Sequence, residues 1–354
     1  MNFEETLKDY KHKIETELKI FFKSSISKVD RIDPSAKEMM EHLAEYNLRN
    51  AKRVRPILTI MGYKAFSGKD EKEIIKASIA IELMQSFFLV HDDIMDQDDM
   101  RRGYYSFHKI YENKAKRKFK NTDPLRYGEN MGIIGGDMLS LLGNEILLNT
   151  NFDYAIKVKA IGKFNKVAIN TCIGQILDIK SEIMPVKETD IEKIHKLKTA
   201  VYTIEGPLHI GAILAGANRN DLKQLSKFAI PLGQAFQVQD DILGMFGKKE
   251  KIGKPADSDL REGKRTLLII KALNKANDKD KKTILNALGN ESVKPEEVDK
   301  VRTIITKTGS LEHSKKLAES LIDKAKALIN DSYINKESKE FLIGMADYML
   351  NREY

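Results

Sequence analysis

Two acidic segments that lie far apart in the sequence carry the residues whose chemistry is easiest to interpret. The first contains Asp92, Asp93 and Asp96, and the second contains Asp240 and Asp241. On a helix, residues four apart project from one face, so Asp92 and Asp96 would lie one turn apart. Carboxylates this close repel each other unless a cation neutralises them, and Mg²⁺ takes such oxygen ligands while sharing itself with phosphate. One Asp-Asp pair alone is more often a solvated helix end, but the second copy favours a metal site.

Basic residues stand beside the first acidic segment and also well before it. Arg101 and Arg102 follow the segment directly, and arginine suits bidentate binding of phosphate. Lys52 and Arg55 come just before Pro56, and proline is tolerated in the first turn of a helix, where free N–H groups favour anions. A basic surface loop is the alternative interpretation of that segment. Acidic residues that could bind a metal ion, next to basic residues that could bind phosphate, predict a diphosphate-binding site.

Further candidate phosphate ligands occur in the second half of the chain. Lys198 and Thr199 lie in a segment with a helical pattern, where a lysine and a hydroxyl could hold a phosphate. A glycine-punctuated loop at 253–266 then brings Lys254 and Lys264, and loops of this kind often close over a ligand. For Lys198 an ordinary surface lysine is the alternative.

Helices must position these side chains, because no strand alternation is visible and the class is predicted to be all-α. Residues 1–30 and 35–50 have amphipathic helical patterns. The stretch 76–100 lacks proline and glycine, so it predicts one buried helix on which Asp99 would extend the acidic stripe by a turn. The lysine-rich segment 111–127 is predicted to be a mobile connection or insertion, with contact to an acidic partner as the alternative.

The composition is that of a folded globular protein with a basic balance. The chain has 354 residues, 60 Lys and Arg against 52 Asp and Glu, a net charge of +8, and 42% hydrophobic residues. An excess of basic residues suits anionic partners. The sequence lacks the patterns that would predict nucleic acid binding, namely a basic patch interleaved with aromatic residues or the spacing of a zinc site. The one cysteine, Cys172, cannot form an intramolecular disulfide. With no signal-peptide pattern and no segment long enough to be transmembrane, we expect a cytoplasmic protein.

Taken together, these segments resemble the all-trans isoprenyl diphosphate synthase family, which includes farnesyl and geranylgeranyl diphosphate synthases. The matching motifs, in the order of the family, are Ala51–Pro56, Asp92–Asp96, Arg101–Gly103, Lys198–Thr199, Phe236–Asp241 and the loop from Gly253 to Lys264. The chain departs from the family pattern in having Ala51 in place of a glycine and Gly244 in place of the last aspartate of the second acidic motif. Position 244 is thereby excluded as a metal ligand.

The resemblance implies a fold and a reaction. It implies a single polyprenyl synthetase domain over residues 1–354, with the isoprenoid synthase fold of antiparallel helices around a deep central cavity, usually as a homodimer. It implies head-to-tail condensation of isopentenyl diphosphate with an allylic diphosphate (dimethylallyl, geranyl or farnesyl). In the family the departing diphosphate is thought to take the proton, so His91 and His108 are expected to be structural.

The resemblance also assigns roles to residues. Three Mg²⁺ ions would be held by Asp92, Asp96 and Asp240, with Asp93 and Asp241 as further candidates. The allylic diphosphate would be bound by Arg101, Lys198, Gln237 and Lys254, with Lys264 nearby. Isopentenyl diphosphate would be bound by Lys52, Arg55, Gln85 and Arg102. The developing carbocation would be faced by Thr199, Tyr202 and Gln237, with Asp178 and Asp259 supporting the ligands from behind.

Two phenylalanines suggest the length of the product. Phe87 and Phe88 precede Asp92 by five and four residues, about one helical turn of ~5.4 Å. The length of one turn is comparable with that of one isoprene unit. Bulky side chains at these positions would therefore close the bottom of the cavity and favour a farnesyl product. The residues around both acidic motifs look more like archaeal geranylgeranyl-type or bifunctional enzymes, which is the alternative. A non-catalytic subunit of a heteromeric prenyl synthase is a more distant alternative.

Overall fold

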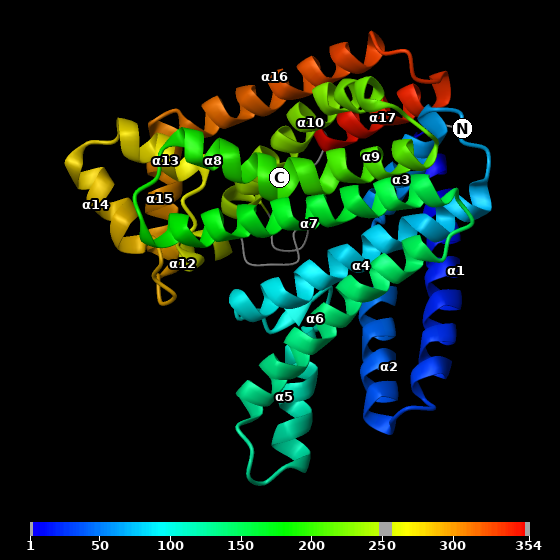
Figure 1. The fold of residues 1–354 in the computed structure, drawn as a ribbon. Helices are drawn as coiled ribbons and strands as arrows, with labels where there is room; N and C mark the ends of the chain where they lie inside the picture. The colour runs from blue at the N-terminus through cyan, green and yellow to red at the C-terminus, as the bar shows by residue number, and fades with distance from the viewer. Residues whose placement is uncertain (1–2, 248–256, 351–354) are drawn as a thin grey trace. The chain divides into compact units, whose positions relative to one another are not determined.

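The computed structural model describes residues 3–247 and 257–350. These residues form helices joined by short turns, with one two-stranded hairpin of β1 (Met100–Arg101) and β2 (Tyr104–Tyr105) (Figure 1). The all-α prediction is confirmed. The chain divides into two compact units, one of Met1–Phe164 with Ile210–Ala217 and one of Asn165–His209 with Asn218–Tyr354. The prediction of a single domain over residues 1–354 stays a prediction.

The first unit is built around one central helix. Its helices are α1 (Phe3–Val29), α2 (Pro34–Leu48), α3 (Val54–Ala65), α4 (Glu71–Met95), α5 (Phe107–Lys118), α6 (Pro124–Leu148), the start of α7 (Tyr154–Ile183) and the end of α9 (Gly206–Leu214). Helix α4 contacts α1, α2, α3, α5 and α6. It begins where the side chain of Asp70 accepts a hydrogen bond from the Glu73 amide over 3.0 Å, which is a typical N-cap. With neither proline nor glycine inside it, the helix runs unbroken to the acidic motif.

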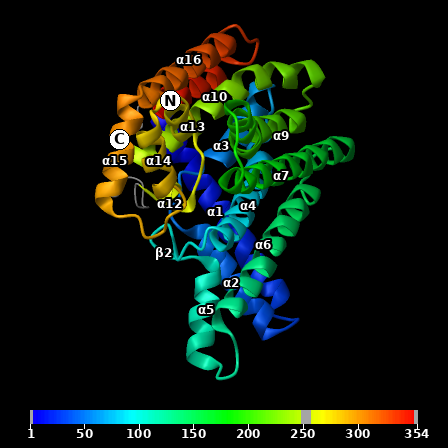
Figure 2. The same ribbon diagram turned by 90° about the vertical axis from the view of Figure 1, so that its left-hand side faces the viewer.

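The second unit is organised by α10 (Arg219–Phe246), which contacts the π-helix η1 (His195–Glu205) and α16 (Ser310–Asn330) (Figure 2). The other elements, apart from the end of α7, are α8 (Glu188–Ile194), the start of α9 (Gly206–Leu214), α12 (Ser258–Glu262), α13 (Leu267–Lys275), α14 (Asp278–Ala287), α15 (Pro295–Lys307) and α17 (Lys336–Leu350). Buried aliphatic residues of α10, α13 and α15, among them Ile242, Leu268 and Val301, share one hydrophobic core.

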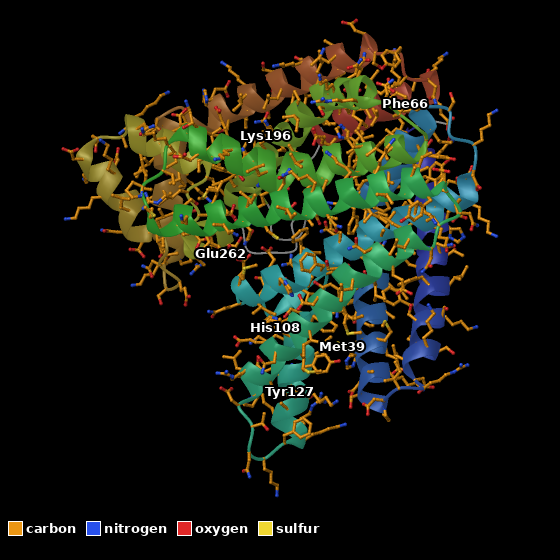
Figure 3. The ribbon with its side chains drawn as sticks, in the orientation of Figure 1. Met39, Phe66, His108, Tyr127, Lys196 and Glu262 are labelled. Carbon is orange, nitrogen blue, oxygen red and sulfur yellow. The ribbon has the colours of Figure 1, made fainter. Side chains whose placement is uncertain are left out.

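The prediction of a mobile connection at 111–127 was wrong. Helix α5 covers its first part and α6 its last, so only residues 119–123 connect the two helices, which lie side by side. Phe107, Tyr111 and Ala115, spaced four apart, are buried on one face of α5, while the lysines occupy the other faces. The ring of Tyr127, which is labelled in Figure 3, lies 5.5 Å from that of Phe119. Three apolar residues on one stripe are enough for a helix that packs against a long neighbour.

The acidic stripe on α4 is also shorter than predicted. The helix ends at Met95, and Asp96 is its C-cap. Asp99 therefore lies outside the helix, where its side chain is 69% exposed and pairs with Lys109 at 3.0 Å.

Two helices of the described residues, α4 and α6, are long and apolar enough to cross a membrane by length and composition alone. In α4 67% of the apolar window is buried inside the protein, and in α6 39%. Core helices of soluble proteins pass the same test, so this is weak evidence for a membrane span.

Candidate active site

The last turn of α4 carries the first pair of predicted metal ligands. Asp92 and Asp96 are both half-buried, and the amide of Asp96 donates to the carbonyl of Asp92 over 2.8 Å. The C-terminal end of a helix already carries a partial negative charge, and two carboxylates add to it. The donor set is oxygen only and half open to solvent, which fits a hard divalent cation that keeps some of its waters.

Asp93, in contrast, points into the protein. Its side chain is fully buried and accepts a hydrogen bond from the Tyr46 hydroxyl (3.1 Å) on one oxygen. The other oxygen accepts from Nε of Arg101 over 2.6 Å and from a terminal nitrogen of the same guanidinium. Burial raises the pKa of Asp93, and the bonds from Arg101 and Tyr46 oppose that rise. Protein donors thus bind both oxygens of Asp93.

The two arginines after the acidic motif lie on the β1–β2 hairpin. Arg102 and Gly103 form its turn with φ angles of 56° and 83°, the left-handed geometry of the tightest hairpin turns. Burial lowers the pKa of Arg102, and the nearby charges of Arg53 and Arg101 lower it further, against the opposing effect of Glu82. The charges of Arg53 and Arg101 beside Arg102 make a region of positive potential, which favours an anion.

The cations of the basic segment before α3 have two different roles. Arg53 is fully buried in a left-handed conformation (φ 54°), where it pairs with Glu82 and donates to two backbone carbonyls at the end of α2. It therefore shapes the turn. Lys52 is exposed and Arg55 is half-buried in the first turn of α3. Only these two of the three cations present their charge outside the core.

The residues predicted upstream of the acidic motif share α4 with it. Gln85 is half-buried, as are Phe87 and Phe88, whose ring centroids lie 4.5 Å apart. The Phe87 ring also packs edge-on against His91 at 4.9 Å. His91 Nε2 lies 3.1 Å from the carbonyl oxygen of Ile133 on α6. This contact with α6 supports a structural role for His91.

In the second unit, the predicted residues Lys198, Thr199 and Tyr202 lie on the π-helix η1. Lys196 marks this helix in Figure 3. π-helices are rare in proteins, and those that occur are often found at functional sites. η1 packs closely on α10, since a Cβ atom on Gly233 of α10 would approach the Cα of Ala200 to 2.4 Å. The close approach brings side chains of the two helices within hydrogen-bonding reach.

A cavity of about 110 Å³ lies within the second unit. Predicted residues on its wall are Asp178, Lys198, Thr199, Gln237, Asp241, Asp259 and Lys264. Lys198 Nζ pairs with Asp178 Oδ2 at 2.5 Å, and Lys264 pairs with Glu262, which is labelled in Figure 3. Tyr202 is buried in η1 and Asp240 is half-buried on α10, and neither is on the cavity wall as described. Lys254 lies outside the described residues.

The departure from the family pattern at Gly244 has a structural counterpart. A Cβ atom on this residue would come within 2.4 Å of Oδ2 of Asp259. The carboxylate of Asp259 thus occupies the space that a side chain at position 244 would need. A larger residue at this position would require the Asp259 carboxylate, the end of a flexible side chain, to move aside.

Sequence reasoning missed several residues that organise these sites. Tyr46 donates to Asp93 and Arg53 pairs with Glu82 in the first unit, and His195 Nε2 lies 3.2 Å from Oδ2 of Asp241 in the second. His195 precedes Thr199 by four residues, which is the one signal in the sequence that could have linked it to the site. Across the described ranges 3–247 and 257–350, no three carboxylate, histidine or cysteine side chains group closely enough to hold a metal alone.

Comparison with known proteins decides the family. Residues 37–305 match the family described as Polyprenyl synthetase. The chain belongs to the polyprenyl synthetase family. A short chain isoprenyl diphosphate synthase of Methanocaldococcus jannaschii is 32% identical over 348 residues, covering 98% of this chain and 96% of the relative. A geranylgeranyl diphosphate synthase of Sulfolobus acidocaldarius is 36% identical over 281 residues, 78% of this chain and 79% of the relative.

A solved structure agrees with the sequence comparison. The geranylgeranyl pyrophosphate synthase of Corynebacterium glutamicum, solved with isoprenyl diphosphate and magnesium, superposes with a TM-score of 0.93 at 27% identity. The match covers 98% of this chain and 99% of that one. This polyprenyl synthetase is therefore a prenyltransferase of the isoprenyl diphosphate synthase type with the helical fold of that family. The recognition made from the motifs is confirmed.

Proposed function

We propose that this polyprenyl synthetase condenses isopentenyl diphosphate with allylic diphosphates to make geranylgeranyl diphosphate. The observation that carries the choice of product is the naming of its relatives, since the Sulfolobus relative at 36% identity is a geranylgeranyl diphosphate synthase. The relatives give no support to the farnesyl product that Phe87 and Phe88 favoured. Both rings are half-buried on α4, where they contact each other and, through Phe87, His91, so they are accounted for in part by packing.

We propose that Asp92 and Asp96 of the first unit and Asp240 of the second hold Mg²⁺, which neutralises the charge that builds up as diphosphate leaves. The chemistry of these side chains supports the proposal, because all three are half-buried carboxylates on α4 and α10. Arg101 and Lys198 would bind the allylic diphosphate with Gln237, Lys254 and Lys264. Lys52, Gln85, Arg55 and Arg102 would bind isopentenyl diphosphate.

The residues of this chain would also exclude water and face the carbocation. When the carbon–oxygen bond of the allylic substrate breaks, the electron pair leaves with diphosphate. The alkene of isopentenyl diphosphate forms the new carbon–carbon bond, and the released diphosphate takes the proton that is lost to complete the product. Thr199, Tyr202 and Gln237 present polar oxygen atoms from a largely buried setting, where fixed dipoles act most strongly.

We further propose a homodimer in the cytoplasm. Helix α6 leaves Ile134, Leu141 and Leu148 exposed at intervals of seven residues, a stripe of the kind that a partner helix covers. A reducing compartment suits the exposed thiol of Cys172.

Product sizing tests the proposed reaction. The protein is incubated with Mg²⁺, labelled isopentenyl diphosphate and each of the dimethylallyl, geranyl and farnesyl primers. We expect a twenty-carbon product from all three primers. Accumulation of a fifteen-carbon product that does not accept another unit would show a farnesyl enzyme, and no incorporation with any primer would contradict the proposal as a whole.

Replacing Phe88 tests whether that ring limits the product. If the half-buried ring of Phe88 forms the floor of the substrate channel, Phe88→Ala should lengthen the product by at least one isoprene unit. The matched replacement is Phe66→Ala, on the half-buried C-cap of α3, and it should leave the product unchanged. An unchanged product from Phe88→Ala would place the floor elsewhere.

A further inference from the structure

Four side chains of the second unit form a chain of contacts between η1 and α10. On α10, the amide nitrogen of Gln237 donates to Oδ1 of Asp241 over 2.8 Å. On η1, the hydroxyl of Thr199 donates to Oε1 of Gln237 over 2.5 Å. His195, four residues before Thr199 on η1, places its Nε2 atom 3.2 Å from Oδ2 of Asp241. Each helix thus contributes two residues four apart, and the two pairs face each other.

The chemistry of Asp241 fixes the direction of this chain. A carboxylate only accepts hydrogen bonds, so Gln237 must turn its amide nitrogen to Asp241 and its carbonyl oxygen to Thr199. That carbonyl oxygen also only accepts, so Thr199 must donate its single hydroxyl hydrogen to it. The lone pairs of the Thr199 oxygen are then directed to other contacts. Thr199 and Gln237 both line the cavity of about 110 Å³.

Asp241 is sealed inside the protein. It is 6% exposed, and its Oδ2 atom is closed to solvent and has no well-aligned hydrogen bond within the described part of the chain. A buried carboxylate is costly unless a cation or donor lies against it. His195, also 6% exposed, is the side chain set against that oxygen. His195 presents Nε2 3.2 Å from that oxygen, so an Nε2–H donor in a less than ideal alignment holds the carboxylate in place.

We propose that His195 is a positioning residue for the prenyl transfer reaction. It holds Asp241, which orients the amide of Gln237, which in turn takes the hydroxyl hydrogen of Thr199. The Thr199 oxygen then meets the developing positive charge with its lone pairs, as a preorganised dipole. The inference rests on the proposed function, which assigns Thr199 and Gln237 to the carbocation. It also makes Asp241 an orienting residue and removes it from the candidate metal ligands.

A double-mutant cycle between His195 and Thr199 tests whether one acts through the other. Loss of one hydrogen-bond-scale contact should lower kcat of His195→Ala by about tenfold. KM for both diphosphates should change little, because the contact matters in the transition state. In a Thr199→Val background, His195→Ala should then cost nothing further. If the two losses in kcat multiply as independent effects, the proposal is overturned.

A second buried histidine of the same unit is the matched control. His209 is 5% exposed and lies 3.1 Å from the Ser226 hydroxyl. We expect His209→Ala to retain the kcat of the unmodified enzyme. His195→Gln, which keeps a donor, should recover most of the activity that His195→Ala loses. If His195→Gln is as slow as His195→Ala while both melt like the unmodified enzyme, His195 does not act as a donor to Asp241 and the proposal fails.

The isosteric variant Asp241→Asn separates orientation from metal binding. An asparagine can donate as well as accept, so it lets Gln237 turn over and should lower kcat. The Mg²⁺ concentration that gives the half-maximal rate should stay the same. A several-fold increase in that concentration would show that Asp241 is a metal ligand and would overturn the inference. Absence of turnover in the unmodified enzyme with every primer would instead overturn the proposed function itself.

Discussion

At the scale of residues, the two acidic motifs use their adjacent aspartates differently. Asp93 and Asp241 are buried and hold Arg101 and Gln237 in place. The aspartate before each of them is half-buried instead. Successive residues on a helix point about 100° apart, so one member of each pair must turn inward when the other faces the substrate. Adjacent identical residues therefore take different roles.

Asp93→Asn should show the cost of disturbing the inward-facing aspartate. The substitution removes the negative charge from a buried ion pair and leaves the guanidinium of Arg101 partly uncompensated. We expect the free energy of unfolding to fall by about 3 kcal/mol, as measured by urea denaturation. KM for the allylic diphosphate should rise, since Arg101 loses the group that fixes its orientation. Asp99→Asn is the control, because that side chain is 69% exposed. Equal effects of the two variants would contradict this account.

At the scale of elements, glycines decide how closely α6 can pack. A Cβ atom on Gly128 of α6 would come within 2.5 Å of the carbonyl oxygen of His108 on α5. On α7, by contrast, a Cβ atom on Gly162 would meet nothing within 4 Å. The same substitution at the two positions should therefore have opposite effects.

Gly128→Ala should destabilise the protein by about 1–3 kcal/mol because α5 and α6 must move apart. Gly162→Ala should stabilise it by up to about 1 kcal/mol because alanine is the better helix former. Thermal melting followed by circular dichroism measures both changes. A stabilising Gly128→Ala would mean that α6 is not held against α5 as described.

The elements also show what the sequence can and cannot predict. The apolar stripe of residues 1–30 predicted α1, whose Tyr10, Ile14, Leu18 and Phe22 are buried. The segment 111–127 was misread because its lysines and arginines together outnumber its apolar residues, although the apolar residues of α5 are correctly spaced. The π-helical form of η1 and the inward turn of Asp93 left no sequence signal, because both depend on packing against other elements. Gly244 could be recognised as a departure, but the carboxylate of Asp259 beside it could not.

At the scale of the whole molecule, charge and exposed apolar surface indicate what the protein binds. A net charge of +8 favours anionic substrates such as diphosphates. The apolar stripe of α6 favours a second copy of the chain, as argued above. These properties belong to the chain as a whole and do not depend on any single site.

Leu141→Glu should disrupt the proposed homodimer. Leu141 is 69% exposed in the middle of the α6 stripe, so a charge there would be buried at an interface and repel its counterpart. We expect analytical ultracentrifugation to show a dimer for the unmodified protein and a monomer for the variant. Ile20→Glu on α1, where the side chain is 58% exposed, should remain dimeric. A monomeric unmodified protein would refute the dimer.

The proposed function depends on Asp92 of α4 and Asp240 of α10 each holding a divalent cation that binds diphosphate. Calorimetric titration with inorganic diphosphate, in the presence and absence of Mg²⁺, tests it most directly. We predict binding that requires Mg²⁺ and that weakens by at least about tenfold in Asp92→Ala and in Asp240→Ala, with helicity unchanged. Diphosphate affinity that is the same without Mg²⁺, or in either variant, would contradict the account.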